Sequence, residues 1–423
     1  MDQLTIQGGY PLYGTIRISG SKNAALPILL SSMLVPEEVV LDGLPHLEDI
    51  RTTVELLRLF GCDCRREEKR LFVLAGSDLS PEAPYELVRT MRASILCLGP
   101  LLARLGRARV AMPGGCAIGS RPIDMHLRSL EKLGASFEIE SGDIVGKCSR
   151  LRGAHVVLDF PTVGGTENLL MASVLAEGET VVENAAQEPE VRDLADFLNS
   201  CGARISGQGT GVLRIQGVNS LRGCNYTVMP DRIEAGTYMA AAGISGGELD
   251  LLNCPLTAME AIIAKLREMG LSVEADQNAV HVRAEKELAC TNIVTRPYPG
   301  FPTDMQAQFM ALMCVARGTG NIRETIFENR FLHALELMRL GAVITITGDT
   351  AQIQGNTPLI GAPVQASDLR ASASLVLAGL AAKGTTTVQQ IHHLDRGYER
   401  MEEKLSRAGA QIKRVRQGEQ PVS

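Results

Sequence analysis

A short amphipathic helix that ends at glycine and leads into an alternating run recurs six times along the chain. Apolar residues at helical spacing precede each glycine, and apolar and polar residues alternate after it as in a half-buried strand. Glycine suits the left-handed position just past a helix end. The segments are 54–66, 127–140, 194–207, 261–275, 334–347 and 401–415, with Gly61, Gly134, Gly202, Gly270, Gly341 and Gly409. The pattern predicts six repeats of about seventy residues.

A second helix precedes the amphipathic one in each repeat and consists mostly of small and apolar residues. A helix that is apolar on nearly every face belongs inside a core. These helices are predicted at 21–34, 92–105, 165–178, 234–247, 304–318 and 368–384, with a β-rich link such as 180–186 or 249–255 before the amphipathic helix. Each repeat therefore reads β-α-β-α-β-β, and three repeats per domain give two similar α/β domains.

Composition and charge restrict the class of protein. With 423 residues, 45% hydrophobic and 21% charged, the chain is long enough for two domains with large cores. A net charge of −6 argues against a nucleic-acid or membrane-surface partner, and no stretch resembles a signal peptide or a membrane span, so we expect a cytoplasmic protein. The ten cysteines are scattered and are expected to be mostly reduced core thiols; neither they nor the seven histidines form a metal-binding pattern.

Several of the buried helices begin with charged residues. Lys22, Arg92, Arg232 and Arg370 stand at or near helix starts, where the helix dipole disfavours a cation, so capping explains them poorly. If such a helix start opens onto a solvent-filled cleft, its backbone N–H groups can instead bind an anion together with these side chains. Asp304 and Asp368 also fit ordinary N-caps. The pattern favours an anion-binding cleft.

Longer motifs then carry a family resemblance. They are SGSKNAALPIL (19–29), TMRASIL (90–96), MPGGCAIGSRPIDMH (112–126), MPDRIEAGT (229–237), FPTDMQAQF (301–309), ETIFENRF (324–331), DLRASASL (368–375) and HLDRGYERM (393–401). From end to end the chain resembles the UDP-N-acetylglucosamine 1-carboxyvinyltransferases, a family of enolpyruvyl transferases. The resemblance implies two inside-out α/β domains of three βαβαββ units each, with the active site in the cleft between them. The implied domains are 21–229, including a catalytic lid loop at 112–122, and 1–20 together with 230–423.

The implied reaction transfers the enolpyruvyl group of phosphoenolpyruvate to the 3′-hydroxyl of UDP-N-acetylglucosamine and releases phosphate. It is the committed step toward peptidoglycan. The resemblance implies these two small-molecule substrates, no metal or organic cofactor, no nucleic-acid partner and no membrane insertion; protein partners are unknown.

This chemistry needs an acid for C3, a base for the hydroxyl and cations for a doubly anionic substrate. Cys116 lies in a Gly-rich loop that suits a mobile lid and matches the family's acid, which can carry a covalent adduct and is the target of fosfomycin. Asp304 matches the residue that orients or deprotonates the hydroxyl. Lys22 and Arg396 complete the expected catalytic set.

Two groups of binding residues carry over from the family. Residues expected to bind phosphoenolpyruvate are Lys22, Asn23, Arg92, Arg121, Arg330, Arg370 and Arg396. Arginine suits this task because its planar fork binds carboxylate and phosphate in bidentate fashion. Residues expected to bind the sugar nucleotide are Asn23, Arg92, Arg121, Pro122, Ile123, Asp124, Met125, Phe160, Pro161, Thr162, Val163, Gly164, Asp304 and Ile326. Some relatives have Lys where Phe160 stands, which puts a charged contact to the diphosphate in doubt there.

Other readings remain open on the sequence alone. A 5-enolpyruvylshikimate-3-phosphate synthase shares the fold and the chemistry, but its relatives lack a lid cysteine in a PGGCAIG motif. A catalytically silent repeat scaffold, such as a nucleic-acid clamp, would want a basic inner face and has no need of Cys116 or Asp304. An inactive paralogue would be expected to have lost some of the catalytic residues, which are all present.

Overall fold

The computed structural model describes residues 2–67, 69–83, 85–88, 91–112, 123–276, 279–284 and 287–416. They form two compact units. One unit, here the terminal unit, comprises the described residues up to Ser19 and from Pro230 onward; the other, here the internal unit, comprises those from Gly20 to Met229.

Three four-stranded sheets belong to the terminal unit. Their orders are β22-β23-β1-β24, β16-β17-β15-β2 and β18-β19-β21-β20. The strands are β1 (Asp2–Gln7), β2 (Tyr13–Arg17), β15 (Glu248–Leu252), β16 (Leu271–Ala275), β17 (Ala279–Ala284), β18 (Ile293–Val294), β19 (Thr319–Arg323), β20 (Val343–Thr347), β21 (Thr350–Gln354), β22 (Pro363–Gln365), β23 (Thr385–Gln389) and β24 (Gln411–Arg416). The helices are α8 (Arg232–Ser245), η3 (Leu256–Ala258), α9 (Glu260–Glu268), η4 (Thr303–Met305), α10 (Gln306–Val315), α11 (Leu332–Arg339), α12 (Leu369–Ala381), η5 (Ile391–Arg396) and α13 (Met401–Arg407).

The internal unit repeats this plan with the sheet orders β14-β3-β5-β4, β6-β7-β9-β8 and β10-β11-β13-β12. Its strands are β3 (Val39–Asp42), β4 (Cys62–Glu67), β5 (Arg70–Ala75), β6 (Glu82–Ala83), β7 (Arg107–Ala111), β8 (Ser136–Glu140), β9 (Asp143–Lys147), β10 (His155–Val157), β11 (Glu179–Glu183), β12 (Arg204–Ser206), β13 (Val212–Gln216) and β14 (Asn225–Thr227). Its helices are α1 (Lys22–Ser31), η1 (Ser32–Leu34), α2 (Glu48–Leu59), α3 (Tyr85–Val88), η2 (Arg92–Cys97), α4 (Leu98–Leu105), α5 (Asp124–Lys132), α6 (Val163–Ser173) and α7 (Pro189–Ser200).

All six sheets share one pairing pattern, which confirms the predicted βαβαββ repeat. In the sheet of β10, β11, β12 and β13, for example, β10 and β11 pair in parallel, and β13 then pairs antiparallel with β11 and with β12. Two repeats of the terminal unit and one of the internal unit combine strands that are far apart in sequence. β1 pairs with β23 and β24, β2 pairs with β15, and β14 pairs with β3. The chain therefore begins inside the sheet in which its last described strand lies.

The repeat glycines lie where the sequence predicts them. Gly61, Gly134, Gly202, Gly270, Gly341 and Gly409 follow the six amphipathic helices with φ between +96° and +104°. A side chain with a Cβ rarely adopts this conformation, so glycine lets each helix end abruptly and turn into the next strand.

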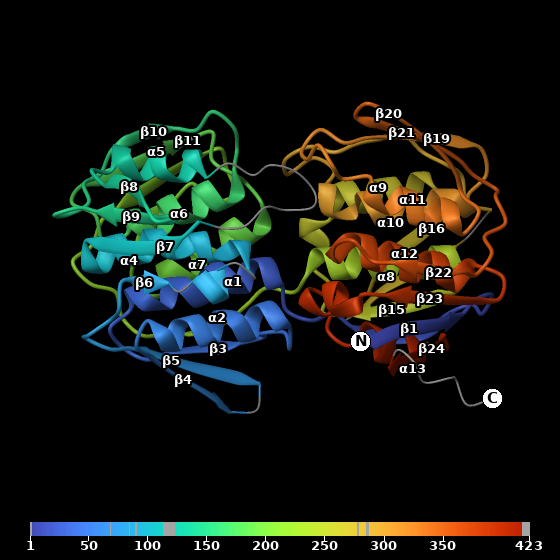
Figure 1. Cartoon of the computed structure of the whole chain (residues 1–423), viewed down its shortest axis with the longest axis horizontal. Coiled ribbons are helices and arrows are strands. Elements are labelled where there is room, and N and C mark those ends of the chain that lie inside the picture. Colours follow the sequence, from blue (N-terminus) through green and yellow to red (C-terminus); the bar gives the residue numbers. More distant parts are fainter. Residues whose placement is uncertain are drawn as a thin grey trace. The chain divides into compact units, whose positions relative to one another are not determined.

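The apolar helices form the cores, as predicted for helices without a polar face. Every residue of α8 from Arg232 to Ile244 is buried, and α8, α10 and α12 pack against one another. In Figure 1 these three helices lie between β19, β20 and β21 at one edge of the terminal unit and β1 and β24 at the opposite edge. Sheets outside and helices inside make each unit an inside-out α/β domain.

Two of the predicted apolar helices differ in detail. The segment 92–105 is the 3₁₀ helix η2 followed by α4, and the segment beginning at Asp304 starts with the 3₁₀ helix η4 before α10. Pro100 falls in the first turn of α4, where its missing N–H costs little. In the part of the chain that the structure describes, no helix is long and apolar enough to span a membrane.

Candidate active site

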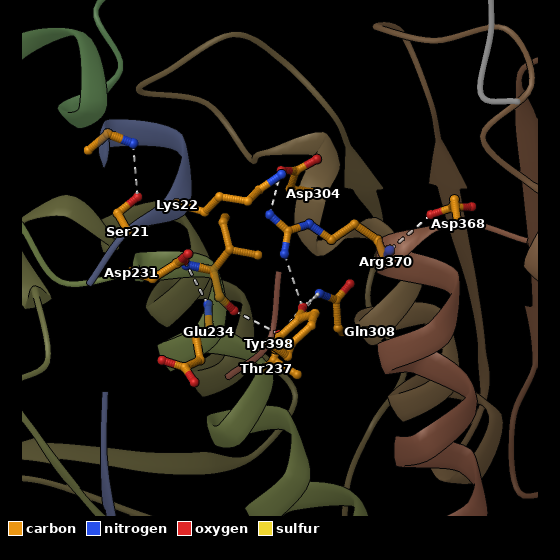
Figure 2. Close-up of polar contacts among 12 residues, drawn as sticks. Ser21, Lys22, Asp231, Glu234, Thr237, Asp304, Gln308, Asp368, Arg370 and Tyr398 are labelled. Carbon is orange, nitrogen blue, oxygen red and sulfur yellow. Dashed lines mark hydrogen bonds and ion pairs between the residues drawn. The ribbon is translucent and has the colours of Figure 1, made fainter. Parts of the chain in front are cut away.

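A carboxylate is held between two arginines in the terminal unit. Asp304 lies in η4, at the start of α10, where its Oδ1 accepts a hydrogen bond from Arg330 Nη2 at 2.9 Å and its Oδ2 accepts one from Arg370 Nη2 at 2.8 Å. Figure 2 shows Arg370 reaching from the start of α12 to Asp304. Both arginine side chains are 5% exposed, whereas Asp304 is 28% exposed. The structure thus brings three of the predicted site residues together.

The capping role considered for Asp304 is wrong. Neither η4 nor α10 has a side-chain cap, because the Asp304 carboxylate is turned to the two guanidinium groups. Asp368 does cap α12, with Oδ1 accepting from the N–H groups of Arg370 and Ala371 at 2.9 and 3.1 Å. Its cap fixes the first turn from which the Arg370 side chain extends.

The electrostatics around Arg370 favour its charged form. Burial opposes the charge, but the Asp304 carboxylate, with Tyr398 and Asp231, raises the pKa of Arg370 above its ordinary value overall. Nearby in α11, burial lowers the pKa of His333 to about 4, while Asp368 and Arg330 act on it in opposite directions. His333 is therefore neutral at pH 7.

Arg396 is the last residue of η5, which packs against α12. Its charge contributes to lowering the pKa of His393, for which burial is the largest cause and His392 a further one, while Asp368 opposes the shift. Arg396 and Asp368 thus both act electrostatically on His393. Because Asp368 caps α12, this places Arg396 near the beginning of that helix. Ile326 lies in the loop after β19, where its N–H donates to Glu324 Oε1 at 2.8 Å.

Lys22 is an ion-pair partner in the internal unit. It is the first residue of α1, which Ser21 caps, and its Nζ lies 2.9 Å from Asp49 Oδ2 in α2. The two side chains are 13% and 5% exposed. An anion that binds Lys22 would therefore have to share this ammonium group with Asp49. Asn23 follows in the same helix and is half-buried, and Arg92 begins η2.

The structure also brings two predicted nucleotide segments together within the internal unit. Ile123, Asp124 and Met125 lie at the start of α5, whereas Phe160, Pro161, Thr162, Val163 and Gly164 lead into α6. Thr162 caps α6, and a Cβ at Gly164 would lie 2.9 Å from the His126 ring. Gly164 thus permits the two helix starts to pack closely. The Phe160 side chain is 42% exposed.

Asn168 of α6 connects these helix starts, forming what we call the Asn168 network. Its Oδ1 accepts from the Gly99 N–H at 2.9 Å, and its Nδ2 lies 3.1 Å from the Ile95 carbonyl and 2.9 Å from His126 Nδ1. Because the amide nitrogen can only donate, His126 Nδ1 accepts and the imidazole is the neutral tautomer with its proton on Nε2. Sequence reasoning missed Asn168 and His126, although a polar residue inside an apolar helix was a usable signal.

Three predicted residues, Cys116, Arg121 and Pro122, lie outside the described residues, as does most of the predicted lid. The nine described cysteines are free, which agrees with the prediction of mostly reduced thiols. Among the described residues, no group of three or more His, Cys, Asp or Glu side chains is placed to hold a metal ion.

The comparisons with known proteins agree with the repeat architecture. The model of the EPSP synthase family, 3-phosphoshikimate 1-carboxyvinyltransferase, matches residues 6–405. The chain belongs to the EPSP synthase family. The matched residues include most of both units, so the family assignment applies to both domains.

Relatives within this EPSP synthase family are close in sequence. The chain is 64% identical to the UDP-N-acetylglucosamine 1-carboxyvinyltransferase of Oleidesulfovibrio alaskensis, with 98% of this chain and 100% of the relative covered. It is 62% identical to the protein of the same name from Desulfovibrio desulfuricans, with 99% and 100% covered. The resemblance inferred from the motifs is confirmed.

A solved structure extends the comparison to the fold. The enolpyruvyl transferase NikO from Streptomyces tendae matches with a TM-score of 0.89 at 26% identity, over 98% of this chain and 99% of that chain. The predicted inside-out α/β fold is confirmed, while the position of the active site in a cleft between the domains stays a prediction.

Proposed function

We propose that this protein transfers the enolpyruvyl group of phosphoenolpyruvate to the 3′-hydroxyl of UDP-N-acetylglucosamine and releases phosphate, the committed step toward peptidoglycan, in the cytoplasm. The observation that carries the proposal is the Asp304 carboxylate held by two buried arginines in a chain that is 64% identical to a relative named for this activity. The two compact units are proposed to be its two enolpyruvyl-transferase domains, 21–229 and 1–20 with 230–423.

The proposed role of Asp304 follows from its hydrogen bonds. Oδ1 accepts a hydrogen bond from Arg330 and Oδ2 accepts one from Arg370, and the side chain is partly exposed. A carboxylate oxygen can accept more than one hydrogen bond, so a substrate hydroxyl can also donate to it. In this role Asp304 orients the 3′-hydroxyl and takes its proton as the oxygen attacks C2 of phosphoenolpyruvate.

The other half of the addition requires a proton at C3. We assign its delivery to the Cys116 thiol, which matches the family's acid and lies in the proposed lid at 112–122. The addition gives a tetrahedral adduct. In the elimination that follows, C3 loses a proton, the double bond re-forms and the C2–O bond to phosphate breaks, which accounts for every atom of the two substrates.

The cations that hold phosphoenolpyruvate are proposed to be Lys22, Arg92, Arg121, Arg330, Arg370 and Arg396, with Asn23. Arg330 and Arg370 support this role because their guanidinium groups are buried and already oriented by Asp304. A buried, oriented guanidinium group binds a carboxylate or phosphate more strongly than a solvated one, since little rotamer freedom is lost on binding.

The sugar nucleotide is proposed to contact Asn23, Arg92, the segment 121–125, the segment 160–164, Asp304 and Ile326. The Asn168 network supports the two segments, because it fixes the starts of α5 and α6 against each other with fully paired hydrogen bonds. A rigid pair of helix starts suits recognition of a large, polar ligand.

The test is release of inorganic phosphate by the purified full chain with phosphoenolpyruvate and UDP-N-acetylglucosamine. We expect steady turnover with this acceptor and none with shikimate 3-phosphate, which serves as the matched control for an alternative enolpyruvyl acceptor. Turnover with shikimate 3-phosphate alone, or with neither acceptor, would contradict the proposal.

A further inference from the structure

Three neutral polar side chains lie buried behind Arg370 in the core of the terminal unit. Thr237 comes from α8, Gln308 from α10, and Tyr398 from the turn between η5 and α13, and none is more than 1% exposed. The Tyr398 hydroxyl lies 2.9 Å from Thr237 Oγ1, 3.1 Å from Gln308 Nε2 and 3.3 Å from Arg370 Nη1. Figure 2 shows Tyr398 at the centre of these contacts. We call these four residues the Arg370 network.

The hydrogen atoms of this network can be assigned from the contacts. Thr237 Oγ1 has one proton, and it donates to the Ile233 carbonyl at 2.7 Å. The proton between Thr237 and Tyr398 must therefore come from Tyr398. Gln308 Nε2 donates its two protons to Tyr398 and to Thr237, 3.1 Å away in each case.

This assignment leaves one arrangement for Tyr398. Its single proton points to Thr237, so its oxygen offers only lone pairs to Gln308 Nε2 and Arg370 Nη1. Burial raises the pKa of Tyr398, against the opposing effect of Arg370, so the hydroxyl keeps its proton at neutral pH. Arg370 Nη1 is thus held by an acceptor at 3.3 Å while Nη2 is held by Asp304 at 2.8 Å.

We propose that Tyr398, Thr237 and Gln308 are positioning residues that fix the orientation of the Arg370 guanidinium group for binding the anionic substrate. Tyr398 acts directly on Arg370, and Thr237 and Gln308 act through Tyr398 by fixing the direction of its proton. The inference rests on the proposed function, in which Arg370 binds phosphoenolpyruvate.

Two features separate positioning from simple core packing. The three side chains come from three different parts of the terminal unit, so the network ties Arg370 to α8 and α10 as well as to its own helix. The neighbouring Tyr238 is also fully buried, but its hydroxyl has no hydrogen-bond partner among the described residues. Burial of a tyrosine in this core therefore does not itself require such a network.

The test compares four single variants in the phosphate-release assay, with KM measured for each substrate and with the melting temperature of each variant. Tyr398→Phe removes the acceptor of Arg370, and Thr237→Val removes the acceptor of Tyr398. Thr237→Ser keeps the hydroxyl, and Tyr238→Phe removes a buried hydroxyl that has no hydrogen-bond partner among the described residues.

We expect KM for phosphoenolpyruvate to rise about tenfold or more in Tyr398→Phe, because a hydrogen bond to a charged group is at stake. In Thr237→Val we expect a smaller rise in KM for phosphoenolpyruvate, because the hydrogen bond that is lost is neutral. KM for UDP-N-acetylglucosamine should stay within about twofold of the wild type in both variants. Thr237→Ser and Tyr238→Phe should match the wild type for both substrates.

An unchanged KM for phosphoenolpyruvate in the folded variants, or an equal rise for both substrates, would overturn the inference and leave only a packing role. If Tyr398→Phe does not fold, the Thr237→Val and Thr237→Ser pair decides by the same criterion. An inactive wild type would instead contradict the proposed function, so the two failures are distinguishable.

Discussion

The two units place buried polar side chains at the same point of the repeat but connect them to different chemistry. Asn168 is the sixth residue after the N-cap of α6, Thr237 the sixth after that of α8, and Gln308 the sixth after that of η4. In the internal unit this position joins Asn168 to a neutral histidine, whereas in the terminal unit it leads to Arg370 and Asp304. The repeat therefore supplies a location for a polar network, and the residues around it decide whether that network carries charge.

The difference has a physical basis in what each network must satisfy. The Asn168 network pairs backbone groups and one imidazole, all neutral, so it needs no counter-charge. Around Asp304 the terminal unit buries the guanidinium groups of Arg330 and Arg370, which is tolerable only with a carboxylate and oriented acceptors around them. We therefore expect changes around Asp304 and Arg370 to affect chemistry most and changes in the Asn168 network to affect stability and binding.

The largest expected effect tests whether either network supplies the proton for C3. The hydroxyl and side-chain amide protons assigned in the two networks are committed to internal hydrogen bonds, which leaves the assignment of this proton to Cys116 in place. Cys116→Ser should lower turnover by about two orders of magnitude or more, because a serine hydroxyl is too weak an acid, whereas Cys116→Asp should keep appreciable activity. Phosphate release measures both. Full activity of the Ser variant would contradict the assignment of the C3 acid to Cys116.

Alkylation by fosfomycin checks the same assignment by peptide mapping. Burial raises the pKa of Cys62, Cys97, Cys254 and Cys314 to about 12, so these thiols are poor nucleophiles. Cys224 is the competitor to exclude, because the hydrogen bond from Cys201 lowers its pKa. The label should stay on Cys116 in a Cys224→Ser variant; a label lost with Cys224 would contradict the assignment.

Asp304→Asn removes the negative charge that pairs with Arg330 and Arg370 in the terminal unit. Turnover should fall about a hundredfold or more, a typical scale for loss of a positioned base. Two buried arginines also lose their counter-charge, so stability should fall by roughly 2 to 4 kcal/mol. Phosphate release and urea denaturation measure the two effects. A variant that unfolds like the wild type would show that Asp304 is not what compensates Arg330 and Arg370.

Asn168→Leu removes the polar side chain at the centre of the neutral Asn168 network. The Gly99 N–H and the Ile95 carbonyl lose the side-chain bonds described above, so stability should fall by about 2 to 3 kcal/mol. KM for UDP-N-acetylglucosamine should rise while KM for phosphoenolpyruvate changes little. Ser173→Ala in the same helix is the control, since the Ser173 hydroxyl has no hydrogen-bond partner among the described residues. An equal change in both KM values would remove the contrast between the units.

The last effect concerns the dependence of stability on pH. Burial raises the pKa of Glu234 to about 7, against the opposing effect of Lys404, whose Nζ lies 2.6 Å from Oε1. Since the native pKa lies above the unfolded value near 4.5, this group stabilises the fold at low pH and loses that contribution as pH rises to about 7. Glu234→Gln should flatten this part of the stability profile by about 3 kcal/mol, measured by denaturation at pH 4.5 and 8.

The exposed Glu260 provides the matched substitution for that measurement, since Glu260→Gln makes the same chemical change at the surface. The stability of Glu260→Gln should vary with pH as that of the wild type does. Parallel pH profiles for the wild type and Glu234→Gln would show that Glu234 does not contribute to the pH dependence.

Local signals in the sequence predict the repeats well. A glycine with positive φ after each amphipathic helix and an apolar helix in each core depend on neighbouring residues, so their pattern is visible in the chain. The charged residues at Lys22 and Arg370 were also recognisable. Their partners were not, because Asp49 and Tyr398 become neighbours only through packing of separate elements.

The Arg370 network shows the same limit. Thr237 and Tyr398 are 161 residues apart, and no local pattern links them. Asp304 was misassigned as a possible cap for a related reason. Its sequence context fits a helix start, but Arg330 of the same repeat and Arg370 of the next repeat compete for its carboxylate and offer stronger, charge-assisted bonds.

The interleaved pairing of β1 has a consequence for synthesis of the protein on the ribosome. All partners of the internal unit's strands are present once β14 has emerged, so that unit can fold early, whereas β1 waits for β23 and β24 near the other end of the chain. At about 5 to 20 residues per second this delay is about 20 to 80 seconds. Throughout it, Leu4 and Ile6, which are fully buried in the finished fold, have no sheet to pack against. The nascent chain therefore carries an unpaired strand ahead of a finished domain, and such a strand can pair with another chain before its own partners have been made.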